Sequence, residues 1–172
     1  GLPYDEINDE LLDGFISDTF SIPKLIVYTE QKEPYIHIDL DTFFYKRYDL
    51  FDENKLYSTF PEGSGNIFNL DNANTMFYRT YVKNTFELKE KLDSNFLEKV
   101  IFNKIPNMSV FGGGDFDLIA EASKYCLDLY NLNKEFFDQG YYNACIIEQL
   151  FIPAAMRMIK DEDIEFEFLC NS

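Results

Sequence analysis

Pro34-Tyr35-Ile36-His37-Ile38-Asp39-Leu40-Asp41-Thr42-Phe43-Phe44 is the segment on which the prediction of the fold chiefly rests. It is a short run rich in β-branched and aromatic residues that follows a proline and ends in two carboxylates one residue apart. This composition is typical of a strand that is buried on both faces in the middle of a parallel sheet. Because alternate side chains of a strand share a face, we expect His37, Asp39 and Asp41 to point the same way.

The two aspartates form a candidate metal site. In an extended strand their carboxylates would lie roughly 6 to 7 Å apart, and their mutual repulsion favours a cation or a proton between them. A hard divalent ion prefers such oxygen ligands. The alternative is a pair of solvated aspartates where a strand enters a loop. The position at the end of an apolar strand, a common place for ligand sites in α/β proteins, keeps the metal site open.

Length, composition and charge limit the class of protein. A chain of 172 residues is expected to form a single domain with a substantial core. It is 46% hydrophobic and 17% aromatic, which indicates a globular protein rather than a disordered one. Its apolar runs are too short to span a membrane. The net charge of −16 argues against nucleic acid as a partner, because binding a phosphate backbone requires a basic surface.

A cytoplasmic location is expected from two further features. The first residues lack the pattern of a signal peptide. The three cysteines, Cys126, Cys145 and Cys170, are an odd number without metal-ligand spacing, so we expect them to be reduced and mostly packed in the core.

Hydrophobic periodicity predicts helices that alternate with strands. A helix is expected at Ser21–Gln31, with Ser21 as its cap and Pro23 near its start. The other expected elements are a short helix near 7–12, strands at 35–41, 43–48 and 56–60, a loop at 61–75, a mostly helical stretch at 76–102, a strand at 106–111, helices at 115–132 and 141–159 with a kink near Pro153, and a strand at 164–169. This order predicts an α/β or mixed α+β domain.

Two further stretches carry candidate site residues. Gly112 and Gly113 belong to a predicted glycine turn between a strand and a helix, with Asp115 at the helix cap. A turn with positive φ, or a backbone that a sugar can approach closely, fits the glycines better than a phosphate loop, because Asp115 would compete for the N–H groups. Glu148 and Gln149 interrupt an otherwise apolar helix, which indicates a polar site or partial exposure.

Two families resemble the Asp-x-Asp stretch only locally. Residues 36–44 are similar to the first metal motif of lesion-bypass DNA polymerases, but no Ser-x-Asp-Glu motif follows and the charge is unsuited to a primer-template. Residues 39–42 resemble the nucleophile motif of haloacid-dehalogenase-type phosphatases, in which Asp39 would attack phosphorus and Asp41 would act as acid and base. That family also needs a later lysine and a carboxylate pair, for which residues 114–117 are poorly spaced.

A third resemblance covers most of the chain and is to GT-A-type glycosyltransferases, in particular a bacterial group of GT-A-like nucleotide-diphospho-sugar transferases. It rests on Pro23-Lys24-Leu25, Glu33-Pro34-Tyr35-Ile36-His37-Ile38-Asp39-Leu40-Asp41, the segment from Asn107 to Gly114, and Glu148-Gln149. The fold that this resemblance implies is a single GT-A-like α/β domain over residues 1–172, with a mixed, mostly parallel sheet flanked by helices.

The activity that the resemblance implies is metal-dependent transfer of a sugar from a nucleotide-diphosphate donor to an acceptor. Mn²⁺ or Mg²⁺ would be held by Asp39 and Asp41, with Asp39 bridging the ribose and the metal. The residues that the resemblance assigns to the donor are His37, Asp39, Gly112, Gly113 and Gln149. Those it assigns to catalysis are Glu148 and Asp115.

One departure from the GT-A pattern keeps other classes of function open. GT-A enzymes bind the nucleotide with a βα segment ahead of the Asp-x-Asp motif, and only 38 residues precede Asp39 here. Either the chain is a fragment of a longer protein or its donor site is reduced. The alternatives are a non-catalytic relative that binds sugars or a partner protein, and the phosphatase that uses Asp39. Metal and nucleotide binding would separate them.

Overall fold

The computed structural model describes residues 19–44, 46–48, 52, 54–64, 85, 87–88, 92–100, 103–139 and 141–170. Its strands are β1 (Tyr35–Ile38), β2 (Leu56–Ser58), β3 (Pro61–Ser64), β4 (Asn103–Pro106), β5 (Val110–Gly113) and β6 (Phe166–Phe168). Its helices are α1 (Ser21–Glu30), α3 (Ser94–Lys99), α4 (Phe116–Leu132), α5 (Lys134–Phe137), α6 (Tyr141–Cys145), the π-helical segment η4 (Ile146–Phe151) and α7 (Ile152–Lys160).

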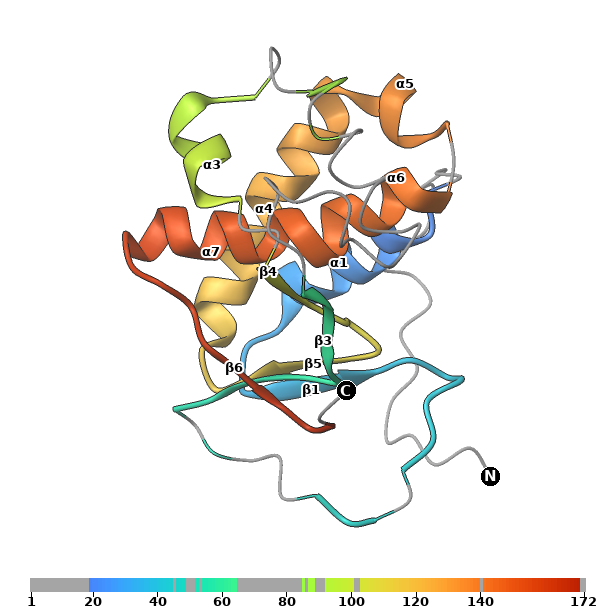
Figure 1. Cartoon of the computed structure of the whole chain (residues 1–172), viewed down its shortest axis with the longest axis vertical. Coiled ribbons are helices and arrows are strands. Elements are labelled where there is room, and N and C mark those ends of the chain that lie inside the picture. The colour runs from blue at the N-terminus through green and yellow to red at the C-terminus, as the bar shows by residue number, and fades with distance from the viewer. Residues whose placement is uncertain are drawn as a thin grey trace.

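A four-stranded sheet forms one layer, and the helices cover one side of it (Figure 1). The strand order is β1-β5-β2-β6. β5 pairs antiparallel with both β1 and β2, and β2 pairs parallel with β6. The predicted α/β class is confirmed. The mostly parallel pairing is wrong, because a short apolar run does not by itself determine the direction of its neighbour.

β1 also differs from the predicted central strand. It lies at the edge of the sheet and ends at Ile38, so the predicted strand 35–41 is too long. Its residues are half-buried or exposed rather than buried on both faces. Residues 43, 44 and 46–48 form no strand, and β1 remains the edge of the sheet.

A second, two-stranded sheet joins β3 and β4 antiparallel, with Pro61 opposite Pro106. The predicted loop at 61–75 therefore begins with a strand, and its residues from 65 onward lie outside the described part of the chain. The predicted helix near 7–12 and much of the helical stretch at 76–102 also lie outside it, whereas α3 falls within that stretch. The predicted strand at 164–169 is confirmed as β6.

Helix α1 forms as predicted, because Ile22, Leu25 and Tyr28 give it one buried face. Its cap differs from the prediction. Phe20 occupies the N-cap position, and the Ser21 hydroxyl instead donates a hydrogen bond of 2.9 Å to the Ala144 carbonyl. This bond ties the start of α1 to α6.

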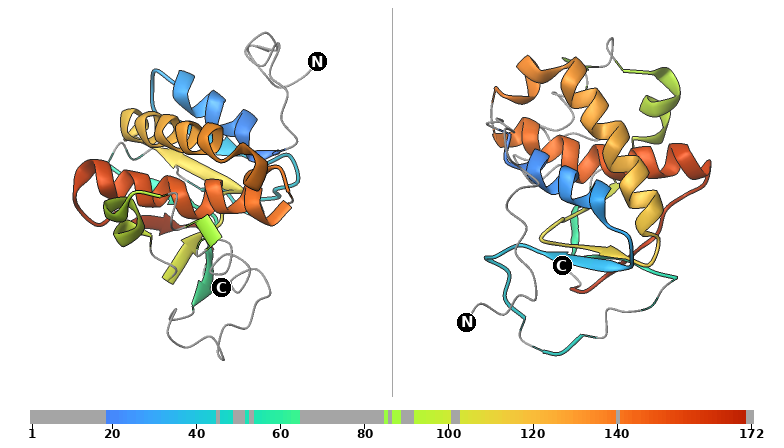
Figure 2. Two further views of the ribbon diagram at one scale, coloured as in Figure 1. Left: turned by 90° about the horizontal axis from the view of Figure 1, so that it is seen from above. Right: turned by 180° about the vertical axis from the view of Figure 1, so that it is seen from behind.

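Helix α4 lies between α1 and α7 and contacts both (Figure 2). Asp115 caps it, as predicted, by accepting a hydrogen bond from the Leu118 amide. All of the residues predicted to face inward are buried, and these are Leu118, Ile119, Ala122, Cys126 and Leu129. α4 therefore forms the centre of the helical layer.

The last long helix is interrupted where the sequence predicted a kink. The π-helical segment η4 joins α6 to α7 and ends two residues before Pro153. A proline has no N–H to donate, and its ring clashes with the carbonyl of the residue four positions earlier, so a wider turn relieves the strain. η4 is buried at five of its six residues, and Glu148 is one of them.

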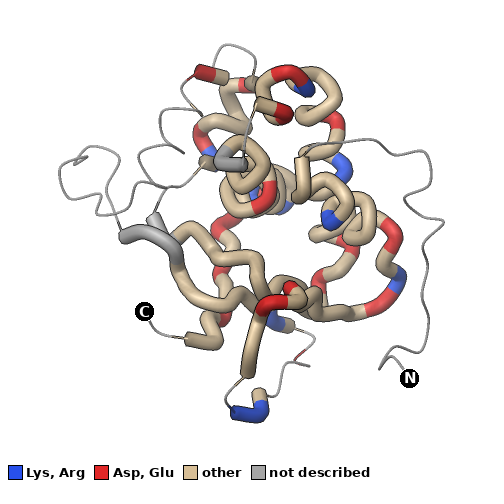
Figure 3. The backbone as a smooth tube through the Cα atoms, turned by 90° about the vertical axis from the view of Figure 1, so that its right-hand side faces the viewer, with Lys and Arg blue, Asp and Glu red and all other residues tan. Residues whose placement is uncertain are grey.

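The cysteines and the charged residues are distributed largely as the sequence predicts. Cys126 and Cys145 are buried, and Cys170 is exposed. Acidic residues are spread along the described backbone (Figure 3), in agreement with 31 acidic against 15 basic residues in the whole chain. No helix in the described part of the chain is both long enough and apolar enough to cross a membrane.

Candidate functional site

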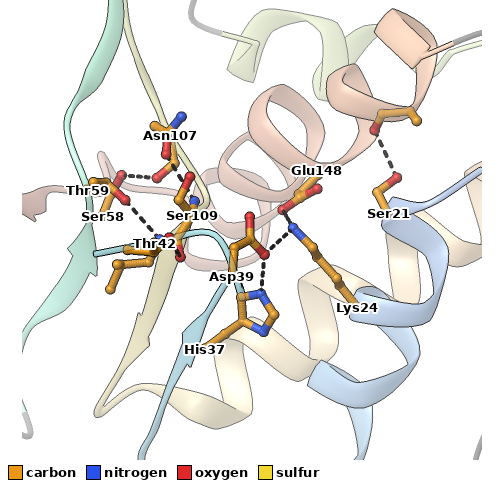
Figure 4. Close-up of polar contacts among 12 residues, drawn as sticks. Ser21, Lys24, His37, Asp39, Thr42, Ser58, Thr59, Asn107, Ser109 and Glu148 are labelled. Atoms are coloured by element: carbon orange, nitrogen blue, oxygen red, sulfur yellow. Dashed lines mark hydrogen bonds and ion pairs between the residues drawn. The ribbon is translucent and has the colours of Figure 1, made fainter. Parts of the chain in front are cut away.

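The candidate site lies at the end of β1, beside α1 and η4 (Figure 4). The Asp39 amide donates a hydrogen bond of 2.8 Å to the Ser109 carbonyl, and the Thr42 amide donates one of 2.9 Å to the Asp39 carbonyl. Residues 39–42 therefore form a turn rather than a continued strand. The prediction that Asp39 and Asp41 lie on one face of a strand is therefore wrong, because both residues belong to this turn.

Lys24 joins two carboxylates that are distant in sequence. Its ammonium lies 2.8 Å from Asp39 Oδ1 and 3.0 Å from Glu148 Oε1. The side chains of Lys24 and Asp39 are 19% and 26% exposed, whereas that of Glu148 is only 4% exposed. Three elements thus meet here: α1 supplies the lysine, the turn after β1 supplies Asp39, and η4 supplies the buried glutamate.

His37 binds the same carboxylate oxygen as Lys24. Its Nε2 lies 2.8 Å from Asp39 Oδ1, and its ring packs edge-on against Tyr28, with ring centroids 5.5 Å apart. Burial lowers the pKa of His37, and the nearby Lys24 lowers it further, although Asp39 acts in the opposite direction. The imidazole is therefore neutral at pH 7 and donates the Nε2 proton to the carboxylate.

The charges of Lys24 and Asp39 stabilise each other. Burial opposes the charge on Lys24, but Glu148 and Asp39 outweigh it and raise the pKa of the ammonium. Burial likewise acts to raise the pKa of Asp39, but hydrogen bonds from Lys24 and His37 outweigh it and lower that pKa. Both groups are therefore charged at neutral pH.

Two acceptors in the site are left for a ligand. Among the described residues, none donates a hydrogen bond to Asp39 Oδ2, and none pairs with the exposed Asp41 carboxylate. The Lys24 ammonium and the carboxylates of Asp39 and Glu148 give the ion-paired cluster a net charge of −1, and Asp41 adds an exposed carboxylate two residues after Asp39. This charge attracts a cation. The described part of the chain contains no group of three or more His, Cys, Asp or Glu side chains that could hold a metal by itself.

A polar network supports the turn that receives Asp39 (Figure 4). The Asn107 side chain accepts a hydrogen bond of 3.0 Å from the Ser109 amide, and the Ser58 hydroxyl donates one of 2.8 Å to the Asn107 carbonyl. The Thr59 hydroxyl accepts a hydrogen bond of 2.8 Å from the Val110 amide. The segment before β5 is thus hydrogen-bonded to Ser58 of β2 and to Thr59, and its Ser109 carbonyl accepts the hydrogen bond from the Asp39 amide.

Gly112 and Gly113 lie inside β5, so the predicted glycine turn is wrong. Their φ angles are 146° and 143°, which favour glycine. A Cβ added to Gly112 would lie 2.2 Å from the Tyr35 carbonyl oxygen, and one added to Gly113 would lie 2.0 Å from that of Lys55. The space next to the glycines, where the sequence predicts the close approach of a sugar, is filled by the backbones of Tyr35 and Lys55. The glycines therefore allow β5 to lie close to β1 and β2 in the sheet.

Asp115 is not part of the cluster around Asp39. β5 runs antiparallel to β1, so Val110 lies opposite Ile38 and Gly113 lies opposite Tyr35. Asp115 follows Gly113 and is therefore at the other end of β1, where it caps α4 and pairs with Lys160 at 2.6 Å. The structure thus separates Asp115 from the other predicted catalytic residue, Glu148.

Gln149 is half-buried in η4 next to Glu148. Lys24 was not among the predicted site residues. It lies three residues after Ser21 and four before Tyr28, both of which are buried, so helical spacing places it beside the inward face of α1. A lysine at such a position is the signal that could have identified it.

The fold and the site together define an α/β domain in which a partly buried cluster of ion pairs orients an aspartate at the end of an edge strand. The chain belongs to the family described as a family of unknown function, DUF6734, whose model matches residues 1–172. Searches of curated proteins and of solved structures give no match.

Proposed function

We propose that the protein is a metal-dependent glycosyltransferase that moves a sugar from a nucleotide-diphosphate donor to an acceptor. One observation carries the proposal: Lys24, Asp39 and Glu148 come from three segments of the GT-A resemblance and meet in a single ion-paired cluster. A solvated Asp-x-Asp turn without a binding role needs no half-buried lysine and buried glutamate to orient it. Because burying charges is costly, this support for one aspartate favours a functional site.

Asp39 and Asp41 supply the protein ligands for the metal. The Oδ2 atom of Asp39 and the exposed carboxylate of Asp41 are hard oxygen donors, which suit Mn²⁺ or Mg²⁺. Mg²⁺ commonly binds through one or two carboxylates together with substrate phosphates and water. When bound, the ion would stabilise the negative charge that develops on the departing diphosphate.

Lys24 and His37 act as positioning residues. Both bind Oδ1 of Asp39, so this carboxylate is held in one orientation and presents its other oxygen to the ligand. His37 is neutral and therefore orients Asp39 without adding a positive charge that would repel a metal. Glu148 anchors the Lys24 ammonium from the buried side, which makes it a positioning residue rather than a group that contacts the sugar. Such support preorganises a binding site.

The test is nucleoside-diphosphate binding that requires a divalent ion. Calorimetric titration of UDP and GDP into the purified chain should give binding in Mn²⁺ and none in EDTA, with an affinity that can be as weak as millimolar, about −4 kcal/mol. Asp41→Asn should weaken Mn²⁺ binding by at least ~1–2 kcal/mol, because one charge and one ligand are lost. Asp128→Asn, which changes an exposed aspartate of α4, is the matched control and should have no effect.

Two results would contradict the proposal at different levels. Nucleotide binding that EDTA leaves unchanged, or equal Mn²⁺ affinity in the Asp41 and Asp128 variants, would exclude the metal site. Metal-dependent nucleotide binding without transfer or hydrolysis of any common nucleotide sugar would favour the non-catalytic binding protein.

The phosphatase alternative is separated by its covalent intermediate. An enzyme of that class would form an aspartyl-phosphate on Asp39, which beryllofluoride mimics. In the proposed transferase Asp39 is a metal ligand and forms no covalent bond. We therefore expect no beryllofluoride adduct at Asp39, and its detection by mass spectrometry or fluorine NMR would favour the phosphatase.

The proposal includes a cytoplasmic location. Nucleotide-sugar donors are made there, and an odd number of cysteines is not typical of a disulfide-bonded secreted protein. Fractionation of cells that produce the native protein tests this part separately.

A further inference from the structure

A group of exposed apolar side chains flanks the aspartates of the candidate site. Within residues 38–44, the exposed fraction is 44% for Ile38, 92% for Leu40, 78% for Phe43 and 42% for Phe44. Elsewhere in the described part of the chain, the large apolar residues with comparable exposure are Phe20 and Leu132. These four residues, called here the apolar tip, therefore concentrate most of the exposed large apolar surface in one short segment.

The apolar tip leads into a basic and aromatic segment. After β1 the chain runs along the side of the sheet that faces away from the helices (Figures 1 and 2). Lys46 and Arg47 are exposed. The Lys46 ammonium lies 4.8 Å from the centroid of the Tyr48 ring, and that ring packs against Phe44 with centroids 5.6 Å apart. Basic and tyrosyl groups are thus held directly beside the exposed phenylalanines.

A lipid surface fits this segment better than a protein partner does. A stable protein interface buries about 800 Å² on each partner and involves roughly 20–30 residues a side, whereas the tip offers four apolar side chains on one turn and its flanks. A bilayer needs no complementary surface. Leucine and phenylalanine at the acyl boundary, with lysine, arginine and tyrosine at the headgroup level, is the composition of an interfacial membrane anchor.

The net charge of the protein indicates which lipid headgroups it can approach. A net charge of −16 opposes approach to an anionic membrane. A phosphatidylcholine headgroup instead carries both a positive choline and a negative phosphate, so it offers partners of opposite charge to the exposed Asp41 and to the exposed Lys46 and Arg47. A zwitterionic surface therefore satisfies both signs of charge around the tip.

We propose that the apolar tip docks the protein peripherally on a zwitterionic lipid surface, with Leu40, Phe43 and Phe44 inserted at the acyl boundary. This docking does not depend on the transferase activity. Where that activity also holds, the site at Asp39 would face acceptors that are presented by the membrane.

Flotation of the purified chain with phosphatidylcholine vesicles tests the docking. The wild-type chain should float with the vesicles, and Phe43→Ser should bind about 10-fold more weakly, because a large apolar side chain no longer leaves water. Leu132→Ser is a matched control, since Leu132 is 79% exposed on α4, away from the tip, and its change should leave binding intact. Adding phosphatidylserine to the vesicles should weaken binding at low salt.

Three outcomes would overturn the docking. The first is that the wild-type chain fails to float at millimolar lipid. The second is that Leu132→Ser loses as much binding as Phe43→Ser. The third is a wild-type dimer in solution that Phe43→Ser converts to a monomer, which would show that a second copy covers the tip. Circular dichroism of each variant confirms that it is folded, so loss of binding is not attributed to loss of structure.

Discussion

Replacing Lys24 with methionine tests the ion-paired cluster directly. Methionine keeps much of the side-chain volume but removes the ammonium that lies 2.8 Å from Asp39 and 3.0 Å from Glu148. Removing one partner of a buried ion pair costs about 3–5 kcal/mol. Glu148 is almost fully buried, but Asp39 is 26% exposed and water can solvate it partly. We therefore expect Lys24→Met to lose about 2–4 kcal/mol of unfolding free energy at pH 7.

The pH dependence of this loss identifies its cause. In the variant the carboxylates of Asp39 and Glu148 no longer face the Lys24 cation. Protonating Glu148, which is the buried one, therefore removes its repulsion with Asp39 and the cost of burying its charge. The folded variant then binds more protons than its unfolded chain, and its relative stability rises as the pH falls. The deficit against the wild type should therefore shrink between pH 7 and about pH 5. Urea unfolding followed by circular dichroism measures it at each pH.

Two further variants separate charge from packing. Lys24→Met combined with Glu148→Gln removes the cation and the buried anion together, and should recover about 1–3 kcal/mol of the loss. Lys124→Met changes an exposed lysine of α4 and should stay within about 0.5 kcal/mol of the wild type. The reasoning is refuted if Lys24→Met costs no more than Lys124→Met, or if its deficit does not change with pH.

Two other predictions concern His37 and the β5 glycines. The chain has one histidine, and burial keeps the pKa of His37 below 6.5 in the folded state, so the unfolded chain takes up the proton first and the wild type should lose stability as the pH falls below about 6.5. His37→Gln should flatten that part of the stability curve, and an unchanged slope would contradict the burial. Gly113→Ala should destabilise the protein by at least ~2–3 kcal/mol, because the new Cβ meets the Lys55 carbonyl oxygen; chemical denaturation measures this, and a neutral effect would contradict the β5 geometry.

Local pattern was enough to predict the elements that bury one clear face. α1 and α4 begin and end within one residue of their predicted bounds, because a stripe at helical spacing packs against the same core along its whole length. The interruption before Pro153 was also predictable, since the missing N–H is a property of that one residue. The pairing of β1 was not predictable in the same way, because its partner, β5, is far away in the sequence: Ile38 pairs with Val110 and Tyr35 with Gly113.

The site was predictable only in part for the same reason. Asp39, Asp41 and Glu148 stand out as carboxylates beside apolar segments, but nothing local to Lys24 shows that Asp39 and Glu148 meet at its ammonium. The ion pair joins residues 124 positions apart in sequence. The one local indication of the role of Lys24 is its helical spacing beside the inward face of α1. This indication is weaker than the Asp-x-Asp motif.

The direction of β5 determines which predicted residues reach the site. In a parallel pairing, the end of β5 would lie beside the end of β1, and Asp115 would be brought to Asp39. In the antiparallel sheet it is the start of β5 that lies there, so the Ser109 carbonyl receives the Asp39 amide, while Asp115 caps α4 at the far end. The carboxylate that joins Asp39 in the cluster is instead that of Glu148 in η4, which pairs with the same Lys24 ammonium. The antiparallel direction of β5 thus takes Asp115 away from the site and leaves the ion pairs of Lys24 as the feature that orients Asp39.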